Sequence, residues 1–264
     1  MDLVYEYLTY DGKSSEDYKI HISGSGVYDS PSRDIESISV PGRNGNLHID
    51  NGRFNNVTIT YPAFCTKDFA QNYEGFKAFL LSKRGYKKLA DSYHPDRYRM
   101  AVYNDQLAPK MATRNKAGSF DISFDCDPRM FLKSGDQVVT CTSGKQLLNP
   151  TLYASKPLIR VYGTGTITIS SVSVVVSSAS VYTDLDCELM EAYKGTTNCN
   201  GNITLSNGVF PELQPGLNTI TFTGFSMVEI TPKWWTIRSL FFLQKILHLL
   251  YLMVWGGLMQ SVAK

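Results

Sequence analysis

Apolar and polar residues alternate with a period of two along most of the chain, which is typical of β-strands with one buried face. The clearest case is Phe54–Tyr61, where Val57, Ile59 and Tyr61 alternate with asparagine and threonine. The same pattern, less regular in places, predicts strands at Leu3–Tyr10, Tyr18–Ile22, Ile35–Val40, Lys88–Ala90, Tyr98–Tyr103 and Gly118–Asp125. The first half of the chain is therefore predicted to be mainly β.

A glycine-rich turn lies between two of these strands. Pro41–Asn46 contains two glycines and two asparagines, residues that tolerate positive φ. The segment from Ile38 to Tyr61 is therefore predicted to consist of strands joined by a tight connection.

One segment has helical spacing instead, and it predicts a helix at about residues 67–84. Thr66 is expected to cap this helix, and Gly85 is expected to end it after two basic residues. Its apolar face consists of Phe69, Tyr73, Phe76, Phe79 and Leu80. An aromatic stripe of this kind usually packs against a sheet, so we interpret it as core rather than as a cofactor site.

The second half is almost purely β from Asn149 onward, with turns about every 8–12 residues, as in a sandwich or barrel. Four regions are predicted. Residues 1–133 form an N-terminal β domain with the helix, 134–149 a polar linker, 150–237 a C-terminal β-sandwich, and 238–264 an apolar extension.

The extension contains a strongly apolar stretch, Leu240–Met259, whose length alone would allow a transmembrane helix of about 20 residues. Gln244, Lys245 and His248 interrupt it, and a lysine at the bilayer centre costs about 2.5–3.5 kcal/mol. We favour an atypical extension over a membrane anchor. A helix packed on a partner and a read-through segment are the alternatives.

Composition narrows the class of function. The chain has 264 residues and a formal net charge of +2, too balanced for the concentrated basic face of a nucleic-acid-binding protein. Met1–Thr9 lacks the basic-then-apolar layout of a signal peptide, so we expect folding in a cytoplasm. The five cysteines include no CxxC pair and are expected to be reduced thiols, with a Cys187–Cys199 disulfide as the alternative.

No segment predicts catalysis or cofactor binding. Asp91, His94 and Asp96 form the one histidine–carboxylate cluster, and its Pro-containing connection favours a solvated turn over a catalytic dyad. Gly24–Gly26 and Gly163–Gly165 are not followed by a helix or a Gly-Lys-Ser/Thr sequence that would bind phosphate. We therefore assign no catalytic, cofactor-binding or metal-binding residue and expect a protein that is not an enzyme.

Two motifs suggest contacts with other molecules. The basic run Lys83–Lys88 is expected to be a solvated helix end, or an intersubunit contact through Lys87 and Lys88. Trp234 and Trp235 cannot share one strand face, so one should face inward while the other needs a partner. Core and intersubunit packing is our preferred interpretation for this pair, and stacking against a glycan is the alternative.

An ordered set of motifs resembles the distal tail proteins of siphophages over about residues 1–237. The N-terminal signature is Ser39–Gly45 with the strand that follows it, and the helix comes next. The remaining motifs are Leu89–Asp91, Tyr98–Ala101, Phe124–Pro128, Asn149–Thr151, Ser155–Ile159, Gly163–Gly165, Pro215–Ile220 and Ile230–Ile237. Each motif is modest alone, and their common order makes the resemblance fairly specific.

This resemblance implies an N-terminal β-sandwich with one helix that forms a homo-hexameric ring, with stacked rings as a further form. It implies a galectin-like or carbohydrate-module-like C-terminal β-sandwich. The implied partners are the tail tube protein, a tail-associated hub protein and receptor-binding proteins, at the distal end of a virion tail assembled in the host cytoplasm. We expect Arg43 and Asn44 to be assembly contacts. The alternative function is a carbohydrate-binding module for host adhesion, with Trp234 and Trp235 as its platform.

Overall fold

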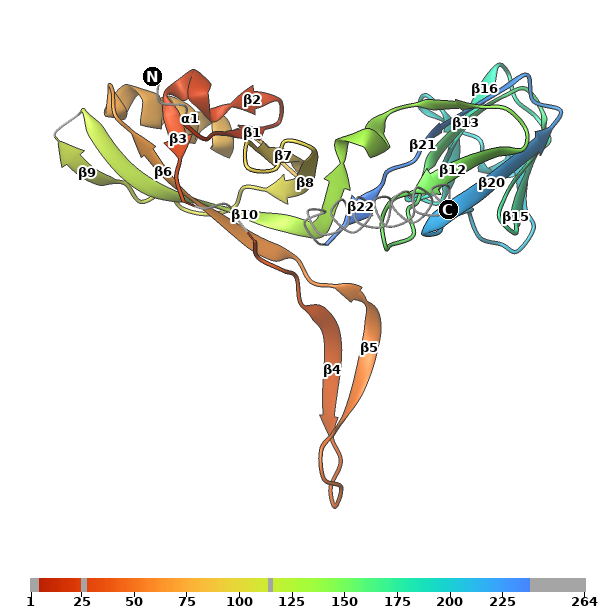
Figure 1. Cartoon of the computed structure of the whole chain (residues 1–264), viewed down its shortest axis with the longest axis horizontal. Coiled ribbons are helices and arrows are strands. Elements are labelled where there is room, and N and C mark those ends of the chain that lie inside the picture. Colours follow the sequence, from red (N-terminus) through yellow and green to blue (C-terminus); the bar gives the residue numbers. More distant parts are fainter. Residues whose placement is uncertain (1–4, 25–27, 114–115, 238–264) are drawn as a thin grey trace, which may run out of the picture.

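The computed structural model describes residues 5–24, 28–113 and 116–237 (Figure 1). It consists of β-strands with a single α-helix in these ranges, which confirms the mainly β prediction. Two β-rich bodies lie side by side along the long axis, and a long hairpin projects from the first. We call these parts the N-terminal barrel, the C-terminal sandwich and the hairpin arm.

The N-terminal barrel is one sheet of nine strands that closes on itself. Its strands are β1 (Leu8–Tyr10), β2 (Lys13–Ser14), β3 (Ile20–Ile22), β6 (Val57–Cys65), β7 (Lys87–Asp91), β8 (Arg97–Val102), β9 (Lys110–Thr113), β10 (Ala117–Leu132) and β22 (Trp235–Thr236). Their order is β2-β1-β7-β8-β10-β6-β3, with β9 and β22 also paired to β10. The amide of Ile22 donates to the Glu6 carbonyl at 2.9 Å, in an isolated bridge that joins β3 to the residues just before β1 and so closes the sheet. A β-sandwich with two separate sheets was expected for this part of the chain. Its strands instead belong to one continuous sheet, which curves round to form both walls of the barrel.

Helix α1 (Phe69–Leu81) covers the barrel core, and all five residues of its predicted apolar face are buried. The helix is shorter than the predicted 67–84. Its N-cap is Asp68 rather than Thr66, and it ends before Ser82, whose hydroxyl donates to the Phe79 carbonyl at 2.7 Å. Lys83 then pairs with Asp11 at 2.7 Å, so the basic run lies beyond the helix instead of in its last turn.

The C-terminal sandwich has two sheets, as predicted. The six-stranded sheet contains β11 (Val139–Cys141), β21 (Met227–Thr231), β13 (Leu158–Tyr162), β16 (Tyr182–Asp186), β17 (Glu191–Lys194) and β18 (Thr197–Asn198). The five-stranded sheet contains β12 (Lys145–Asn149), β20 (Gly216–Thr223), β14 (Gly165–Ile169), β15 (Val172–Val176) and β19 (Ile203–Leu205). Ile159, Ile167 and Val228 are fully buried in the core that the sheets share.

The predicted linker, residues 134–149, is part of the folded structure. After a short 3-10 turn, Lys133–Asp136, β11 pairs with β21 and β12 pairs with β20. Each therefore completes an outer edge of one sheet. Short edge strands between polar turns carry too little alternation to be seen in the sequence. The sandwich accordingly begins near Val139 rather than at residue 150.

The chain also returns to its first body at the end of the described residues. Trp235 and Thr236 of β22 pair with Phe131 and Met130 of β10. The two bodies are thus connected twice, by the chain leaving β10 and by the chain entering β22. These last residues, predicted to belong to the C-terminal domain, complete the N-terminal sheet.

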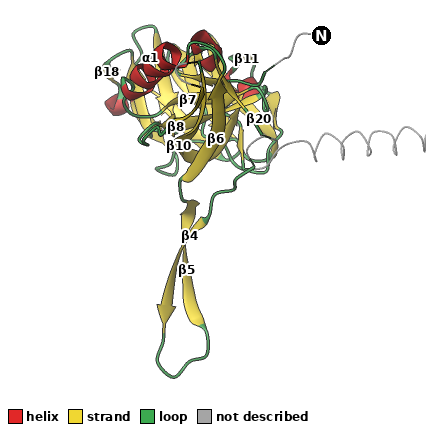
Figure 2. Ribbon diagram, turned by 90° about the vertical axis from the view of Figure 1, so that its left-hand side faces the viewer, coloured by secondary structure: helices red, strands yellow, loops and turns green. Residues whose placement is uncertain are grey.

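The hairpin arm consists of β4 (Arg33–Ser39) and β5 (Asn46–Phe54), which pair only with each other. Figure 2 shows it extending well away from the two bodies. Gly42 and Gly45 in its turn have φ of 78° and 80°, which confirms the glycine-rich connection. No helix in the described part of the chain is long and apolar enough to cross a bilayer. The predicted extension, 238–264 with Leu240–Met259, lies outside the described residues.

Candidate functional site: the hairpin arm and the domain junction

The hairpin arm has one apolar face. In its register Ile38 lies opposite Leu47 and Glu36 lies opposite Ile49. Opposite residues of an antiparallel pair share a face, and so do alternate residues of one strand. Ile38, Leu47 and Ile49 therefore lie on the same face, where their side chains are 38%, 42% and 43% exposed. We call these three residues the apolar strip.

The opposite face of the arm is largely polar. Ser37 and His48 face each other there, with 2.9 Å between Oγ and Nδ1. Near the base of the arm, Arg33 pairs with Asp50 at 3.0 Å. This ion pair is solvent-exposed and contributes little to stability, about 0–1 kcal/mol. The arm is therefore an amphipathic ribbon, and its apolar strip is left partly exposed by the described residues of the chain.

Arg43 and Asn44, the predicted assembly contacts, lie at the tip of the arm and are exposed. The backbone amide of Arg43 donates to the Val40 carbonyl at 3.2 Å, which closes the turn. Neither side chain contacts another part of the described chain. Both are available to a second molecule.

Lys87 and Lys88, the other predicted assembly contacts, lie in β7 beside the junction of the two bodies. The Lys88 ammonium contacts the Asp136 carboxylate at 2.6 Å and lies 4.3 Å from the centre of the Tyr98 ring. The charge of Lys88 is thus satisfied within its own chain. Lys87 is half-buried.

Asp136 is the centre of the polar contacts at the junction. It accepts hydrogen bonds from Lys88 at 2.6 Å and Tyr98 at 2.9 Å, and Lys233 lies 3.2 Å away. Burial raises the pKa of this carboxyl, but the two hydrogen bonds and the Lys233 charge outweigh burial and hold the pKa below its ordinary value. Asp136 therefore remains ionised and joins β7, β8 and the segment before β22.

The two tryptophans have different environments. Trp234 is 5% exposed and packs in the core of the sandwich. Trp235 is half-buried, stacks on Tyr153 and donates from Nε1 to the Ala154 carbonyl at 2.9 Å. The expected inward and outward pair is therefore observed, and Trp235 has its partner within the same chain.

Tyr98, Phe131 and Trp235 occupy opposing positions on β8, β10 and β22 and so form one row across the sheet. Tyr98 and Phe131 are stacked, with ring centroids 5.6 Å apart. The Arg129 guanidinium lies 5.1 Å from the centre of the Phe131 ring. This aromatic row faces the C-terminal sandwich.

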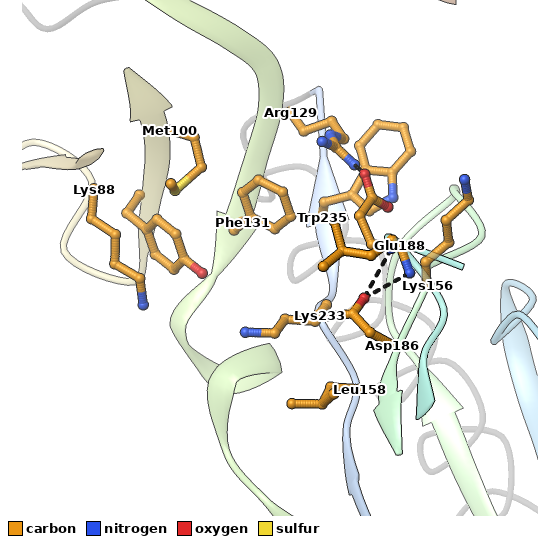
Figure 3. Close-up of a pocket in the computed structure, with 12 residues that line it drawn as sticks. Lys88, Met100, Arg129, Phe131, Lys156, Leu158, Asp186, Glu188, Lys233 and Trp235 are labelled. Atoms are coloured by element: carbon orange, nitrogen blue, oxygen red, sulfur yellow. Dashed lines mark hydrogen bonds and ion pairs between the residues drawn. The ribbon is translucent and has the colours of Figure 1, made fainter. Parts of the chain in front are cut away.

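A pocket of about 440 Å³ lies between the aromatic row and the sandwich (Figure 3), and we call it the junction pocket. Lys156, Leu158, Glu188 and Leu189 line its sandwich side. Arg129 reaches across and contacts Glu188 at 2.8 Å, as well as Asp127 at 2.8 Å. The pocket thus combines aromatic and aliphatic walls with charged groups that are mostly paired.

The cluster of Asp91 and His94 is more buried than predicted. Their side chains are 11% and 10% exposed and lie 3.1 Å apart, and the Tyr61 hydroxyl donates to Asp91 at 2.8 Å. Burial raises the pKa of Asp91, but hydrogen bonds from His94 and Tyr61 bring it below its ordinary value. The expected solvated turn is instead a largely buried network, in which Tyr61 of β6 and Asp91 of β7 are joined to His94. Asp96 pairs outside this network with Arg97 at 2.9 Å.

The cysteine thiols are free, including Cys187 and Cys199, and four of the five are buried. Burial raises the pKa of Cys126 to about 12. In the described ranges no three His, Cys, Asp or Glu side chains are grouped as metal ligands would be.

Sequence reasoning missed Asp136, Arg129 and Tyr153, which the structure places at the junction. Asp136 lies in the segment that was predicted to be a linker. The partners of Asp136 and Arg129 include residues 97 and 59 positions away, so no local pattern indicates them.

Comparison with known proteins finds a family model that matches part of the chain and solved structures of similar fold. Residues 13–126 match the family model of the phage tail protein RIFT-related domain. The matched range contains the hairpin arm, helix α1 and most of the strands of the N-terminal barrel. A search of the curated proteins finds no match.

Among solved structures, the chain is similar to the Dit protein (gp 19.1) of phage SPP1, described as a paradigm of the hub adsorption apparatus in phages that infect Gram-positive bacteria. The identity is 17% and the TM-score 0.66, over 85% of this chain and 97% of that one. Two baseplate structures of phage p2, activated with Sr and with Ca, match with 13% identity and TM-scores of 0.48 and 0.49. They cover 85% and 86% of this chain and 97% of each matched chain. The chain thus has the fold of a siphophage distal tail protein, as its sequence motifs predicted.

Proposed function

We propose that this protein is the distal tail protein of a siphophage, a structural hub whose ring joins the tail tube to the host-recognition proteins. The observation that carries the proposal is the apolar strip of the hairpin arm. The role we propose for the protein is assembly and not catalysis. The phage tail domain and the distal-tail fold support this assignment.

The physical argument starts from the cost of exposing the apolar strip. Fully burying one aliphatic side chain contributes about 1.5–3 kcal/mol. Ile38, Leu47 and Ile49 lie side by side and are each about 40% exposed, so covering them together is favourable. A two-stranded hairpin alone is also only marginally stable in water. The arm is therefore best stabilised when its apolar face docks on another molecule.

The partner we propose for the arm is a neighbouring copy of the same chain. An arm that reaches from one subunit onto a different surface of the next makes a head-to-tail contact, and such contacts form a ring when the rotation between neighbouring subunits closes. We propose a homo-hexamer, because the sequence resemblance implies that number. Arg43 and Asn44 at the tip would then contact the neighbouring subunit.

Within a tail, the ring would contact the tube protein on one side and the tail-associated hub protein on the other. Receptor-binding proteins would attach at the periphery through the sandwich. The protein would be assembled in the cytoplasm of the host bacterium and would remain at the distal end of the virion tail.

The test is the solution mass of the full chain, measured by light scattering across a dilution series. We expect a species of hexamer mass, or of stacked hexamers. Replacing the apolar strip by Ile38→Ser, Leu47→Ser and Ile49→Ser should shift it to monomer. The matched control, Ser37→Ala with His48→Ala, alters the polar face of the same arm and should leave the ring intact.

Circular dichroism and thermal melting should show that both variants remain folded, because the arm lies outside the two cores. A wild-type chain that is monomeric at every concentration would contradict ring formation and favour the carbohydrate-binding alternative. A ring that survives loss of the apolar strip would contradict the assembly role of the arm.

A further inference from the structure

We propose that the junction pocket is a binding site for a neutral saccharide. This activity is separate from ring assembly and does not depend on it. Four features of the pocket support it: an oriented aromatic ring, adjacent hydrogen-bonding groups, a balanced set of charges and a suitable volume.

The aromatic ring is the indole of Trp235. Tyr153 stacks on one of its faces, with ring centroids 4.4 Å apart, and the hydrogen bond from Nε1 to Ala154 fixes its orientation. The Trp235 side chain also lines the junction pocket. An aromatic side chain with its polar group already satisfied offers a rigid apolar surface, on which the C–H face of a sugar ring can pack.

Hydrogen-bonding groups surround this ring. Figure 3 shows Glu188 and Lys156 on the sandwich side of the same region as Trp235. Arg129 contacts Oε1 of Glu188 at 2.8 Å, which orients the carboxylate and leaves Oε2 as an acceptor within the described structure. The Lys156 ammonium is exposed and adds a donor. Oriented acceptors and donors beside an aromatic ring suit the hydroxyls of a sugar.

The charges favour a neutral ligand over a phosphate or another anion. Of the cations that line the pocket, Lys88 and Lys233 share the carboxylate of Asp136, and Arg129 contacts two carboxylates. Lys156 is the remaining one and is solvent-exposed. A phosphate site needs several cations free to converge on one point, and these are already engaged.

The volume is suitable as well. The pocket holds about 440 Å³, within the range of about 300–1,000 Å³ found for small-molecule sites. It lies at the boundary of two folded bodies, where such sites are common. It is therefore large enough for a sugar unit while the rest of a glycan chain extends into solvent.

The test uses the full chain and three neutral probes: methyl glucoside, methyl galactoside and N-acetylglucosamine. Saturation-transfer difference NMR should detect binding of at least one probe, and titration should give a saturable millimolar Kd. Glucuronic acid serves as an anionic comparison and should bind no better than methyl glucoside.

Leu189→Trp tests the location. Leu189 lines the mouth of the pocket and is 61% exposed, so a larger side chain there should obstruct the site without affecting the core. We expect Kd to rise at least tenfold. The matched control is Leu217→Trp, because Leu217 is 66% exposed on β20 of the other sheet. This control should bind like the wild type.

Trp235→Phe tests the aromatic surface, with Kd expected to rise several-fold. The proposal is overturned if none of the neutral probes binds, if Leu189→Trp and Leu217→Trp bind equally well, or if glucuronic acid alone binds. These outcomes leave the ring measurement unaffected, so failure of this site and failure of the assembly function can be told apart.

Discussion

The indole ring of Trp235 stacks on the phenol ring of Tyr153, with ring centroids 4.4 Å apart and planes 22° from parallel. Trp235 belongs to the barrel sheet through its pairing with Phe131, whereas Tyr153 lies in the loop between β12 and β13 of the sandwich. Tyr153 also meets Phe54, at the base of the hairpin arm, edge-to-face at 6.5 Å. Two aromatic contacts that share Tyr153 thus link the barrel, the sandwich and the arm.

Replacing Trp235 should destabilise this link. We expect Trp235→Ala to lower the free energy of unfolding by about 2–3 kcal/mol, less than the roughly 3–5 kcal/mol of a fully buried aromatic, because the ring is half-buried. Urea denaturation of the full chain measures the change. Trp235→Phe is the control, since it keeps a ring against Tyr153, and it should lose clearly less. Equal losses for the two variants would show that stacking contributes nothing.

Acid should weaken the junction through Asp136. The pKa of this carboxyl is lowered in the folded state, so its contribution to stability is present above the unfolded pKa of about 3.9. That contribution is lost as the pH falls below this value through the folded pKa. We expect the free energy of unfolding to fall with pH below about 4, with a smaller slope in Asp136→Asn.

The slope in Asp136→Asn should not vanish, because the pKa of Asp91 is lowered as well. Denaturant unfolding at pH values between 7 and 3 provides both slopes. If the pH dependence of the free energy of unfolding were the same in Asp136→Asn as in the wild type, these contacts would not lower the pKa of Asp136.

Gly135 should tolerate no side chain. A Cβ at this position would collide with the backbone nitrogen of Trp234, and it would lie 3.1 Å from the Trp234 Cβ. Backbone cannot move aside cheaply, so we expect Gly135→Ala to cost about 1–3 kcal/mol or more. Gly201→Ala is the control, because nothing lies within 4 Å of its added Cβ. Thermal melting of both variants should separate them clearly.

Thiol labelling should report the burial of the cysteines. Cys199 is partly exposed, whereas the other four thiols are buried. Burial also raises the pKa of Cys126 to about 12, which suppresses its reactive thiolate. We expect a thiol reagent at pH 8 to modify one cysteine rapidly in the native chain and all five after unfolding. Rapid native modification of Cys126 would contradict the described core.

The tip of the arm should matter for assembly and not for folding. Arg43 is exposed and its side chain contacts no other described residue, so Arg43→Glu should change the free energy of unfolding by no more than about 0.5 kcal/mol. The same substitution reverses a charge that we place at the subunit contact. Light scattering should therefore show a higher dissociation concentration for the ring. A ring of unchanged affinity would remove Arg43 from the contact.

Patterns that depend on near neighbours were predictable. Alternation at Val57, Ile59 and Tyr61 identifies a strand because residues two apart share a face, and all three are buried. The face of α1 follows from spacings of three and four residues in the same way. The turn of the arm follows from Gly42 and Gly45, which supply the positive φ that it requires.

The amphipathic arm was only half predictable. Its first strand and its turn are predicted from the sequence, whereas β5 (Asn46–Phe54) is not among the predicted strands, and the apolar strip depends on the pairing of Ile38 with Leu47. The arm lies apart from both bodies because β4 and β5 pair only with each other. Without that pairing, Ile35–Val40 reads as an ordinary strand with one buried face.

The sequence by itself determined where most of the described strands and helix α1 form, because those signals arise from side chains a few positions apart. Tertiary structure alone decided that β22 returns to β10, that Glu6 and Ile22 close the barrel, and that the junction pocket exists. Asp136 and Lys233 are 97 positions apart, and no local rule relates them. Such contacts depend on how whole sheets pack together. The burial of the two large cores sets the positions of these residues, and local sequence preferences do not.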